Sequence, residues 1–199
     1  MEFPSSGIES AKEKLDKLIH STGAYQYSAE GFRLVSGKTS EFYFDLKLLN
    51  GDPEGLYTVA MIFYHHIKKL PDVRAVGGLE SGSISIAAAI SQLSYIENKK
   101  DDTNPKITSF FVRKEQKLHG TKKSIEGKIT SPVVIIDDVI TSGMSAISAV
   151  NAVEKAGHKC KCLMSIIFRG NQRQYEEITK SVPLQYVFAK EQFTKQLTT

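Results

Sequence analysis

Apolar residues near the start of the chain recur at spacings of three and four: Ile8, Ala11, Leu15, Leu18 and Ile19. This pattern predicts an amphipathic helix over about 8–20. Three short runs follow, AYQYS, FRLVS and FYFDL, separated by Gly and Ser residues. Such runs are typical of strands. The first 50 residues are therefore expected to form a small N-terminal hood beside the rest of the chain.

From residue 54 onward, helical and extended patterns alternate. The expected helices cover 54–69, 83–96, 143–156 and 171–180, and the expected strands cover 73–79, 107–113, 132–138, 161–168 and 184–189. The segments PVVIIDD and MSIIF are apolar without alternation, as in parallel strands that helices cover on both faces. The order of elements predicts an α/β fold with a doubly wound, mainly parallel sheet.

The length of 199 residues fits a single domain. We expect a hood over 1–50 and an α/β core over 51–199. The polar stretch 113–130 is long for a connection in a compact domain, and such stretches are usually functional or disordered. Residues 113–127 are therefore expected to form a mobile functional loop.

Charge adds one detail to this picture. The net charge of +4 and the pI of about 8.9 are compatible with nucleic acid, a membrane surface or a small polyanion. The positive residues, however, crowd into one segment: Arg113, Lys114, Lys117, Lys122 and Lys123. This placement favours a local anion site. The N-terminus shows no apolar signal region and no stretch spans a membrane, so we expect a cytoplasmic protein without a membrane partner.

Two other kinds of site are disfavoured by spacing. Cys160 and Cys162 could share a strand face with His158, but no further ligands follow at metal-binding spacing. Two buried, reduced thiols are the expected outcome. Gly37-Lys38-Thr39 resembles the end of a P-loop, yet Phe32 occupies the position that requires the first Gly.

The segment 133–150, VVIIDDVITSGMSAISAV, carries the strongest chemical signal. An apolar strand ends in Asp137 and Asp138, and a turn of small residues precedes a helix. The turn consists of Thr141, Ser142, Gly143, Met144 and Ser145. Ligands of open α/β sheets bind at such strand ends, and hydroxyls with helix N–H groups can cradle a phosphate. Each feature taken alone is better explained by a capped helix after a buried strand, but the combination is much less common.

The combination resembles the signature of type I phosphoribosyltransferases, an acidic pair followed by T-x-G-x-S. The resemblance implies that Asp137 and Asp138 contact the ribose hydroxyls of 5-phosphoribosyl-1-diphosphate. It also implies that residues 141–145 hold the 5-phosphate. The expected cofactor is Mg²⁺, held mainly by the substrate rather than by a dedicated set of protein ligands.

The segment FFVRKEQKLHG, followed by IEG, is the most family-specific part of the chain. Its cations could neutralise a departing pyrophosphate when a mobile lid closes. The order R-K-E-x-K-x-H-G resembles the catalytic loop of orotate phosphoribosyltransferases. The resemblance implies that Arg113 and Lys114 bind the diphosphate substrate and that Lys117 and His119 are also catalytic. In that family the loop reaches the neighbouring subunit's site, so a homodimer is implied.

Three further segments match the same family in order. Tyr43 and Phe44 match an aromatic pair near the base, and Arg169 matches a residue that binds the orotate carboxylate. The loop with Glu80, Ser81 and Gly82 matches the one that meets pyrophosphate. Lys47 stands where one branch of the family is basic. Departures from common family residues occur at Val35, Ser81, Leu118 and Phe168.

The resemblance implies the conversion of orotate and phosphoribosyl diphosphate to orotidine 5′-monophosphate and pyrophosphate, a step of pyrimidine biosynthesis. Thr141 and Arg169 would orient orotate, with Tyr43 and Phe44 close by. One alternative keeps the fold and uses uracil or a purine; a panel of bases separates these. Another is a regulator that senses phosphoribosyl diphosphate and binds nucleic acid. The first 50 residues show no helix-turn-helix pattern, so we expect no nucleic-acid partner, and filter binding would test this.

Overall fold

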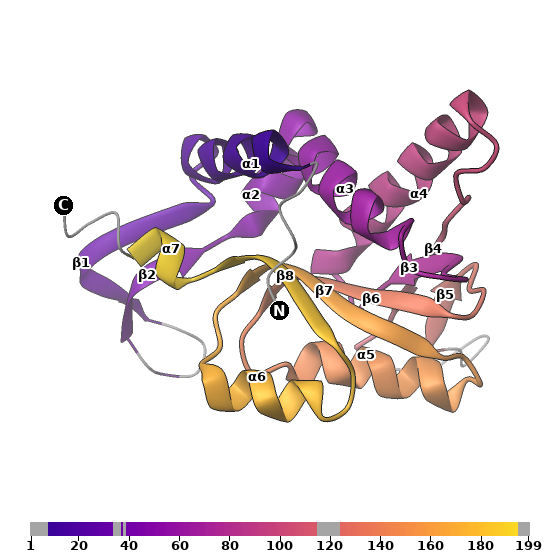
Figure 1. The fold of residues 1–199 in the computed structure, drawn as a ribbon. Helices are drawn as coiled ribbons and strands as arrows, with labels where there is room; N and C mark the ends of the chain where they lie inside the picture. Colours follow the sequence, from indigo (N-terminus) through magenta and orange to yellow (C-terminus); the bar gives the residue numbers. More distant parts are fainter. Residues whose placement is uncertain (1–7, 34–36, 38, 115–123, 195–199) are drawn as a thin grey trace.

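A six-stranded central sheet organises the computed structural model, which describes residues 8–33, 37, 39–114 and 124–194 (Figure 1). The strand order is β5-β4-β3-β6-β7-β8. These strands are β3 (Ala75–Gly77), β4 (Thr108–Val112), β5 (Ile125–Gly127), β6 (Val133–Ile140), β7 (Cys160–Phe168) and β8 (Leu184–Ala189). Only the pairing of β4 with β5 is antiparallel among the described strands of this sheet. The expected mainly parallel sheet is confirmed.

Helices cover both faces of the sheet, which confirms the doubly wound α/β fold (Figure 1). The helices on one side are α1 (Glu9–Ser21), α2 (Leu46–Gly51), α3 (Pro53–Ile67) and α4 (Gly82–Lys100). Those on the other side are α5 (Met144–Lys155) and α6 (Gln172–Thr179), and the short α7 (Glu191–Thr194) follows β8. Sequence patterns predicted α1, α3, α4, α5 and α6, with ends shifted by a few residues, but they did not predict α2 or α7.

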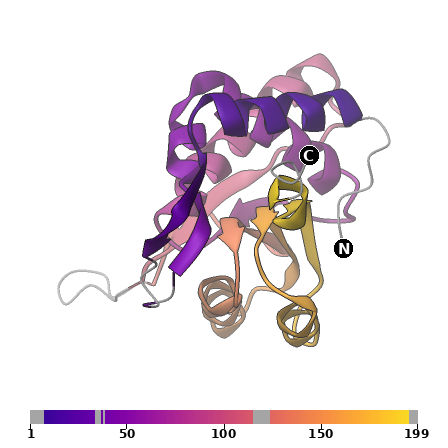
Figure 2. The same ribbon diagram turned by 90° about the vertical axis from the view of Figure 1, so that its left-hand side faces the viewer.

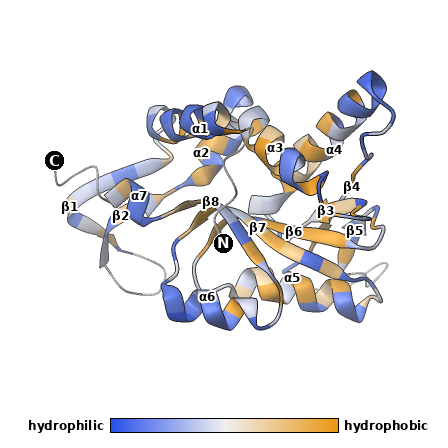
Figure 3. Cartoon of the chain, viewed as in Figure 1, coloured by the Kyte–Doolittle hydropathy of each residue, from blue (hydrophilic) through white to orange (hydrophobic). Residues whose placement is uncertain are grey.

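Strand β6 shows why the apolar run has no alternation. Val134 and Ile136 are buried in the core on the α3–α4 side. Val133 and Ile135 are buried in the core on the α5 side. Successive side chains of a strand point to opposite faces, so a strand between two helix layers needs apolar residues at every position. The hydropathy colouring shows this apolar centre of the sheet (Figure 3).

The N-terminal region forms a separate antiparallel pair of strands, β1 (Tyr25–Arg33) and β2 (Thr39–Phe44), beside the central sheet (Figures 1 and 2). Most of the first expected run and the start of the second, at Phe32 and Arg33, therefore belong to one strand rather than two. The pairing register shifts between Tyr27 and Phe32, around Gly31 at a φ of 77°, a conformation that suits glycine. The third run ends at Phe44, because the Asp45 side chain accepts a hydrogen bond from the N–H of Lys47 and caps α2.

Helix α7 fastens this strand pair to the central sheet. Phe193 is fully buried, and its ring centroid lies 5.4 Å from Tyr25, 5.3 Å from Phe44 and 5.6 Å from Phe188 of β8. The Tyr25 hydroxyl donates to the Phe193 carbonyl at 3.3 Å. Aromatic clusters of this kind stabilise beyond the area that they bury. The C-terminal end of the described chain thus holds β2 in place.

The expected loop over 113–130 is partly wrong, because Ile125–Gly127 forms strand β5 at the edge of the sheet. The three-residue strand is too short to show a periodic pattern. Gly127, at a φ of 101°, packs where a Cβ would meet the Ser109 carbonyl at 2.7 Å. Residues 115–123 lie outside the described part of the chain.

The cysteines are part of the core. Cys160 and Cys162 are free thiols on β7, and burial raises the pKa of each to about 12. Within the described residues, no group of three or more His, Cys, Asp or Glu side chains could hold a metal ion. No helix in the described part of the chain is long and apolar enough to cross a membrane.

His66 is a buried histidine of α3, with 5% of its surface exposed. Because of this residue, we expect the fold to lose stability in acid. Burial first, and then the positive charges of His65, Lys69 and Lys12, lower the pKa of His66 to about 4. Between pH 6.5 and about 4 the unfolded chain binds a proton at this residue that the folded chain does not. The free energy of unfolding is therefore expected to fall by about 3 kcal/mol between pH 6.5 and 4.

Urea unfolding of wild type and His66→Gln across this pH range measures the effect. The variant is expected to lose most of the slope between pH 6.5 and 4. His20→Gln, at an exposed position on α1, controls for the loss of an imidazole as such. An unchanged slope in His66→Gln would show that another group causes the acid sensitivity.

Candidate active site

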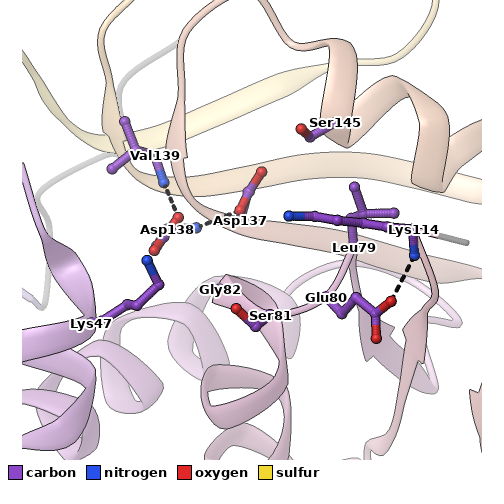
Figure 4. Close-up of a pocket in the computed structure, with 10 residues that line it drawn as sticks. All are labelled: Lys47, Leu79, Glu80, Ser81, Gly82, Lys114, Asp137, Asp138, Val139 and Ser145. Atoms are coloured by element: carbon purple, nitrogen blue, oxygen red, sulfur yellow. Dashed lines mark hydrogen bonds between the residues drawn. The ribbon is translucent and has the colours of Figure 1, made fainter. Parts of the chain in front are cut away.

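A cleft of about 220 Å³ lies at the carboxyl ends of the central strands (Figure 4). It is lined by Lys47, Leu79, Glu80, Ser81, Gly82, Lys114, Asp137, Asp138, Val139 and Ser145. We call it the acidic cleft. Open α/β sheets bind their ligands at this edge, because the loops that follow parallel strands converge there.

Asp137 and Asp138 lie near the end of β6 and are half-buried. Asp137 Oδ1 accepts the N–H of Asp138 at 3.0 Å, and Asp138 Oδ1 accepts the N–H of Val139 at 2.8 Å. Burial and then the charge of Asp138 raise the pKa of Asp137 to about 7, against the opposing effect of Lys114. A carboxyl with a raised pKa in a cleft marks a candidate functional site, and the oxygens of the two carboxyls can hydrogen bond with ligand hydroxyls.

The loop between β3 and α4 forms the opposite wall of the acidic cleft. The Glu80 carboxylate accepts the backbone N–H of Lys114 at 2.8 Å, and the N–H of Glu80 donates to Val112 at 2.9 Å. These bonds join the loop to the end of β4, so that the Lys114 side chain lines the same cleft. Ser81 is the N-cap residue of α4, and Gly82 begins that helix. The structure thus brings Glu80, Ser81 and Gly82 next to the acidic pair.

A second pocket, of about 170 Å³, surrounds the turn before α5. Thr141, Ser142, Gly143, Met144 and Ser145 line it together with Asp137. Gly143 is the N-cap residue of α5, at a φ of 77°, and a Cβ there would meet Ile178 at 2.6 Å. Glycine is therefore required on two grounds. Hydroxyls and helix N–H groups around one hollow are the features of a phosphate site.

A third pocket, of about 230 Å³, lies where β2, β7 and the C-terminal segment meet. Ser40, Phe42, Phe44, Thr141, Arg169, Lys190 and Thr194 line it; we call it the aromatic pocket. The Arg169 guanidinium lies 5.6 Å from the centroid of the Phe44 ring. Burial lowers the pKa of Arg169, but an arginine stays charged in proteins. This pocket can hold a flat anion.

The aromatic pair of β2 is divided between two faces. Ser40, Phe42 and Phe44 alternate along the strand and line the aromatic pocket. Tyr43 points to the other face, where its ring centroid lies 5.6 Å from that of Phe32. Tyr43 therefore does not join Phe44 among the lining residues, because neighbours on a strand cannot share a face.

Sequence reasoning missed several residues of the aromatic pocket. Residues two apart on a strand share a face, so the match at Phe44 could also have identified Ser40 and Phe42. Lys190 and Thr194 follow β8, far along the chain from the motifs, and no local pattern connects them to the site.

The cations of the expected loop have different positions. Lys114 lines the acidic cleft. The Arg113 Nε is 3.1 Å from a carboxylate oxygen of Glu126 on β5, and its guanidinium lies 5.5 Å from the centroid of the Phe111 ring. Arg113 does not appear among the residues that line the acidic cleft. The two expected catalytic residues of the loop, Lys117 and His119, lie outside the described residues.

The three pockets form a continuous row. The second pocket, which we call the phosphate pocket, shares Asp137, Val139 and Ser145 with the acidic cleft, and it shares Thr141 with the aromatic pocket. One ligand can therefore extend from carboxylates and cations, past a phosphate cradle, to an arginine beside an aromatic ring.

Known proteins resemble this chain in sequence and in architecture, although no protein-family model matches it. An orotate phosphoribosyltransferase of Aquifex aeolicus is 37% identical over 182 residues, covering 89% of this chain and 94% of that protein. One of Rhodopseudomonas palustris strain TIE-1 is 39% identical over 142 residues, covering 68% and 72%. The solved orotate phosphoribosyltransferase of Aeropyrum pernix superposes with a TM-score of 0.73 at 26% identity, covering 92% of this chain and 98% of that one. The chain belongs to the orotate phosphoribosyltransferase family.

Proposed function

We propose that this chain transfers the 5-phosphoribosyl group of phosphoribosyl diphosphate to orotate, forming orotidine 5′-monophosphate and pyrophosphate in the synthesis of UMP. The observation that carries the proposal is the row of three pockets joined by Asp137 and Thr141. The acidic cleft fits ribose hydroxyls and a diphosphate, the turn before α5 fits the 5-phosphate, and the aromatic pocket fits orotate.

The ribose is held at the boundary between the first two pockets. Each carboxylate of the Asp137–Asp138 pair already accepts one backbone N–H through Oδ1, which leaves its other oxygen to accept from a ribose hydroxyl. The 5-phosphate accepts hydrogen bonds from the hydroxyls of Thr141, Ser142 and Ser145 and from N–H groups at the start of α5. Met144, which is 76% exposed at the first position of α5, contributes its backbone.

The reaction breaks the bond between ribose C1 and the pyrophosphate oxygen, and orotate N1 forms the new bond to C1. Positive charge develops on the ribose while negative charge accumulates on the leaving group. The Lys114 ammonium in the acidic cleft stabilises that negative charge in the transition state. Lys117 and His119 are proposed to assist at the same group, as the family pattern implies. The negative charge of orotate lies on its carboxylate, so N1 loses its proton as the new bond forms, and the departing pyrophosphate can accept that proton.

The carboxylates of the acidic cleft suit Mg²⁺ as cofactor. Mg²⁺ keeps several waters when it binds proteins and substrate phosphates, and Asp137 and Asp138 would hold it through such water. The substrate would supply most of the ligands of this metal. When bound, Mg²⁺ supplies neutralisation of the pyrophosphate charge.

In the aromatic pocket, Arg169 pairs with the orotate carboxylate, and the Phe44 ring packs beside the pyrimidine. Thr141 reaches both the base and the phosphate turn. A charged donor for a carboxylate distinguishes orotate from uracil and from purines. The base is thus selected by residues from β2, β7 and the segment after β6.

A base panel tests the proposed function. Purified protein is supplied with Mg²⁺, phosphoribosyl diphosphate and one base at a time: orotate, uracil, adenine, hypoxanthine or guanine. Pyrophosphate release is expected with orotate and not above background with the others. Faster release with another base would assign the chain a different substrate, and release with none would overturn a transferase function.

We further propose that the enzyme is a homodimer of the cytoplasm. Helices α3 and α4 carry exposed apolar side chains, among them Tyr57 at 54% and Tyr95 at 49%, and exposed apolar patches mark association surfaces. The free thiols Cys160 and Cys162 suit a reducing compartment. Sedimentation equilibrium is expected to give twice the chain mass of 22.1 kDa, and a single-chain mass would contradict a dimer.

Gly82 provides a test of the acidic pair that leaves its carboxylates in place. A Cβ on Gly82 would lie 2.9 Å from Cγ of Asp138, so Gly82→Ala must displace that carboxylate. Loss of one charge-assisted hydrogen bond is expected to lower kcat/KM for phosphoribosyl diphosphate by about 10- to 100-fold. Gly51→Ala, where a Cβ has no neighbour within 4 Å, is the matched control and is expected to remain active. Wild-type kinetics in Gly82→Ala would show that the position of Asp138 is not critical.

A further inference from the structure

Lys47 is a cation of the acidic cleft that the reaction described above does not use. It lies in the first turn of α2 and lines the cleft together with Ser81, Gly82 and Asp138 (Figure 4). Its side chain extends toward Asp138 and into the cleft (Figure 4). The side chain is exposed, so it has no role in the core of the described chain.

The backbone of Lys47 is fixed on both sides. Its N–H donates to the Asp45 carboxylate at 3.3 Å, which caps α2. Phe44, just before Asp45, is buried against Arg169 and Phe193. Leu46, just after it, is buried in the core. A flexible side chain on a fixed backbone loses less freedom on binding than one on a mobile loop.

The acidic cleft contains a second cation besides Lys114. Glu80, Asp137 and Asp138 contribute three carboxylates to its lining, whereas Lys114 and Lys47 contribute the two ammonium groups. A pyrophosphate that enters among carboxylates is repelled unless cations lie closer to it. Lys114 extends from the end of β4, and Lys47 approaches from α2 on the Asp138 side (Figure 4). The two lysines thus lie on different sides of the space that a diphosphate would fill.

We propose that Lys47 binds the diphosphate of the substrate and of the departing pyrophosphate, opposite Lys114. The inference rests on the proposed function, which places pyrophosphate in the acidic cleft. It assigns to α2 a direct part in substrate binding. Because Lys47 follows Phe44 by three residues, one short segment then contributes to both the diphosphate site and the base site.

Isothermal titration with two ligands tests the role. Wild type, Lys47→Gln and Lys47→Arg are titrated with Mg²⁺-pyrophosphate and, separately, with ribose 5-phosphate. The Gln variant is expected to bind pyrophosphate about tenfold more weakly and ribose 5-phosphate with unchanged affinity, because a charged partner is lost at one end only. The Arg variant, which keeps the charge, is expected to bind both ligands within about twofold of wild type. Lys17→Gln, at an exposed position on α1, is the control.

Lys47 could instead act through Asp138 by neutralising its carboxylate, and an Asp138→Asn background separates the two roles. If Lys47 contacts pyrophosphate, Lys47→Gln still weakens pyrophosphate binding in that background. If it acts only through Asp138, the second change has no further effect, and our inference is overturned. Equal loss of both ligands would also overturn it. The failure of this inference and that of the proposed function are distinguishable. If the wild type uses orotate and Lys47→Gln binds pyrophosphate normally, only the role of Lys47 is refuted. If the wild type binds no pyrophosphate and uses no base, the proposed function is refuted too.

Discussion

Changing both Asp137 and Asp138 to Asn is expected to lower kcat/KM for phosphoribosyl diphosphate by about 100- to 10,000-fold while leaving the chain folded. Each carboxylate is proposed to accept a hydrogen bond from a ribose hydroxyl, and a charged acceptor contributes about 1.5–3 kcal/mol. An amide keeps one oxygen that can accept the backbone bonds of Asp138 and Val139. The amide nitrogen, however, cannot accept from ribose.

Stability is expected to change in the opposite direction to activity. The pKa of Asp137 is raised to about 7, so the folded chain retains a proton that the unfolded chain releases above its ordinary pKa of 3.8. The stability contributed by this residue is present at low pH and is lost as the pH rises through about 7. At pH 8 the ionised Asp137 therefore destabilises the fold, and Asp137→Asn is expected to raise the Tm.

Steady-state kinetics and thermal unfolding at pH 5 and pH 8 measure both effects. Asp102→Asn, at an exposed loop position, controls for the loss of a carboxylate and is expected to change neither. Near-normal activity in the double variant would refute the ribose role. A lower Tm at both pH values would instead show that the carboxylates stabilise the fold, contrary to the usual trade-off between stability and activity at functional sites.

The central part of the site was predictable because sequence order and spatial order coincide there. Asp137, Asp138 and Gly143 follow one another along one strand, one turn and one helix. The apolar run of β6 locates the strand, and its carboxyl end locates the site. Gly143 fits the left-handed start of α5, at a φ of 77°. No long-range contact is needed to place these residues near a ligand.

The aromatic pocket could not be predicted from local patterns, because it is assembled from distant segments, and only the family resemblance connected Phe44, Thr141 and Arg169. Phe44, Thr141, Arg169 and Lys190 come from β2, the turn before α5, the end of β7 and the end of β8. Local patterns do not determine which strands lie side by side. The pairing of β4 with β5 could not be predicted for the same reason, and this pairing places Glu126 beside Arg113. Tyr43 shows a further limit: both residues of the aromatic pair looked suitable, and only the pleat of β2 decides which one faces the pocket.

Arg169→Gln is expected to raise the KM for orotate by about 10- to 100-fold, the effect of losing a charge-assisted hydrogen bond to a carboxylate. The KM for phosphoribosyl diphosphate should change little, because Arg169 lines the aromatic pocket and neither of the other two described pockets. Arg173→Gln, on the surface of α6 with its guanidinium near Glu177, is a matched control. It is expected to leave both constants at their wild-type values.

Kinetics alone cannot separate recognition from packing, because the Arg169 guanidinium also lies over the Phe44 ring, 5.6 Å from its centroid. Orotidine 5′-monophosphate and UMP differ only in the carboxylate of the base, so their binding to wild type and Arg169→Gln forms a cycle that isolates this group. If Arg169 binds the carboxylate, the variant loses about 10- to 100-fold in affinity for orotidine 5′-monophosphate and little for UMP. Equal losses for the two nucleotides would mean that Arg169 acts by holding Phe44 in place, and the carboxylate would then need another cation of the same pocket, for which Lys190 is the candidate.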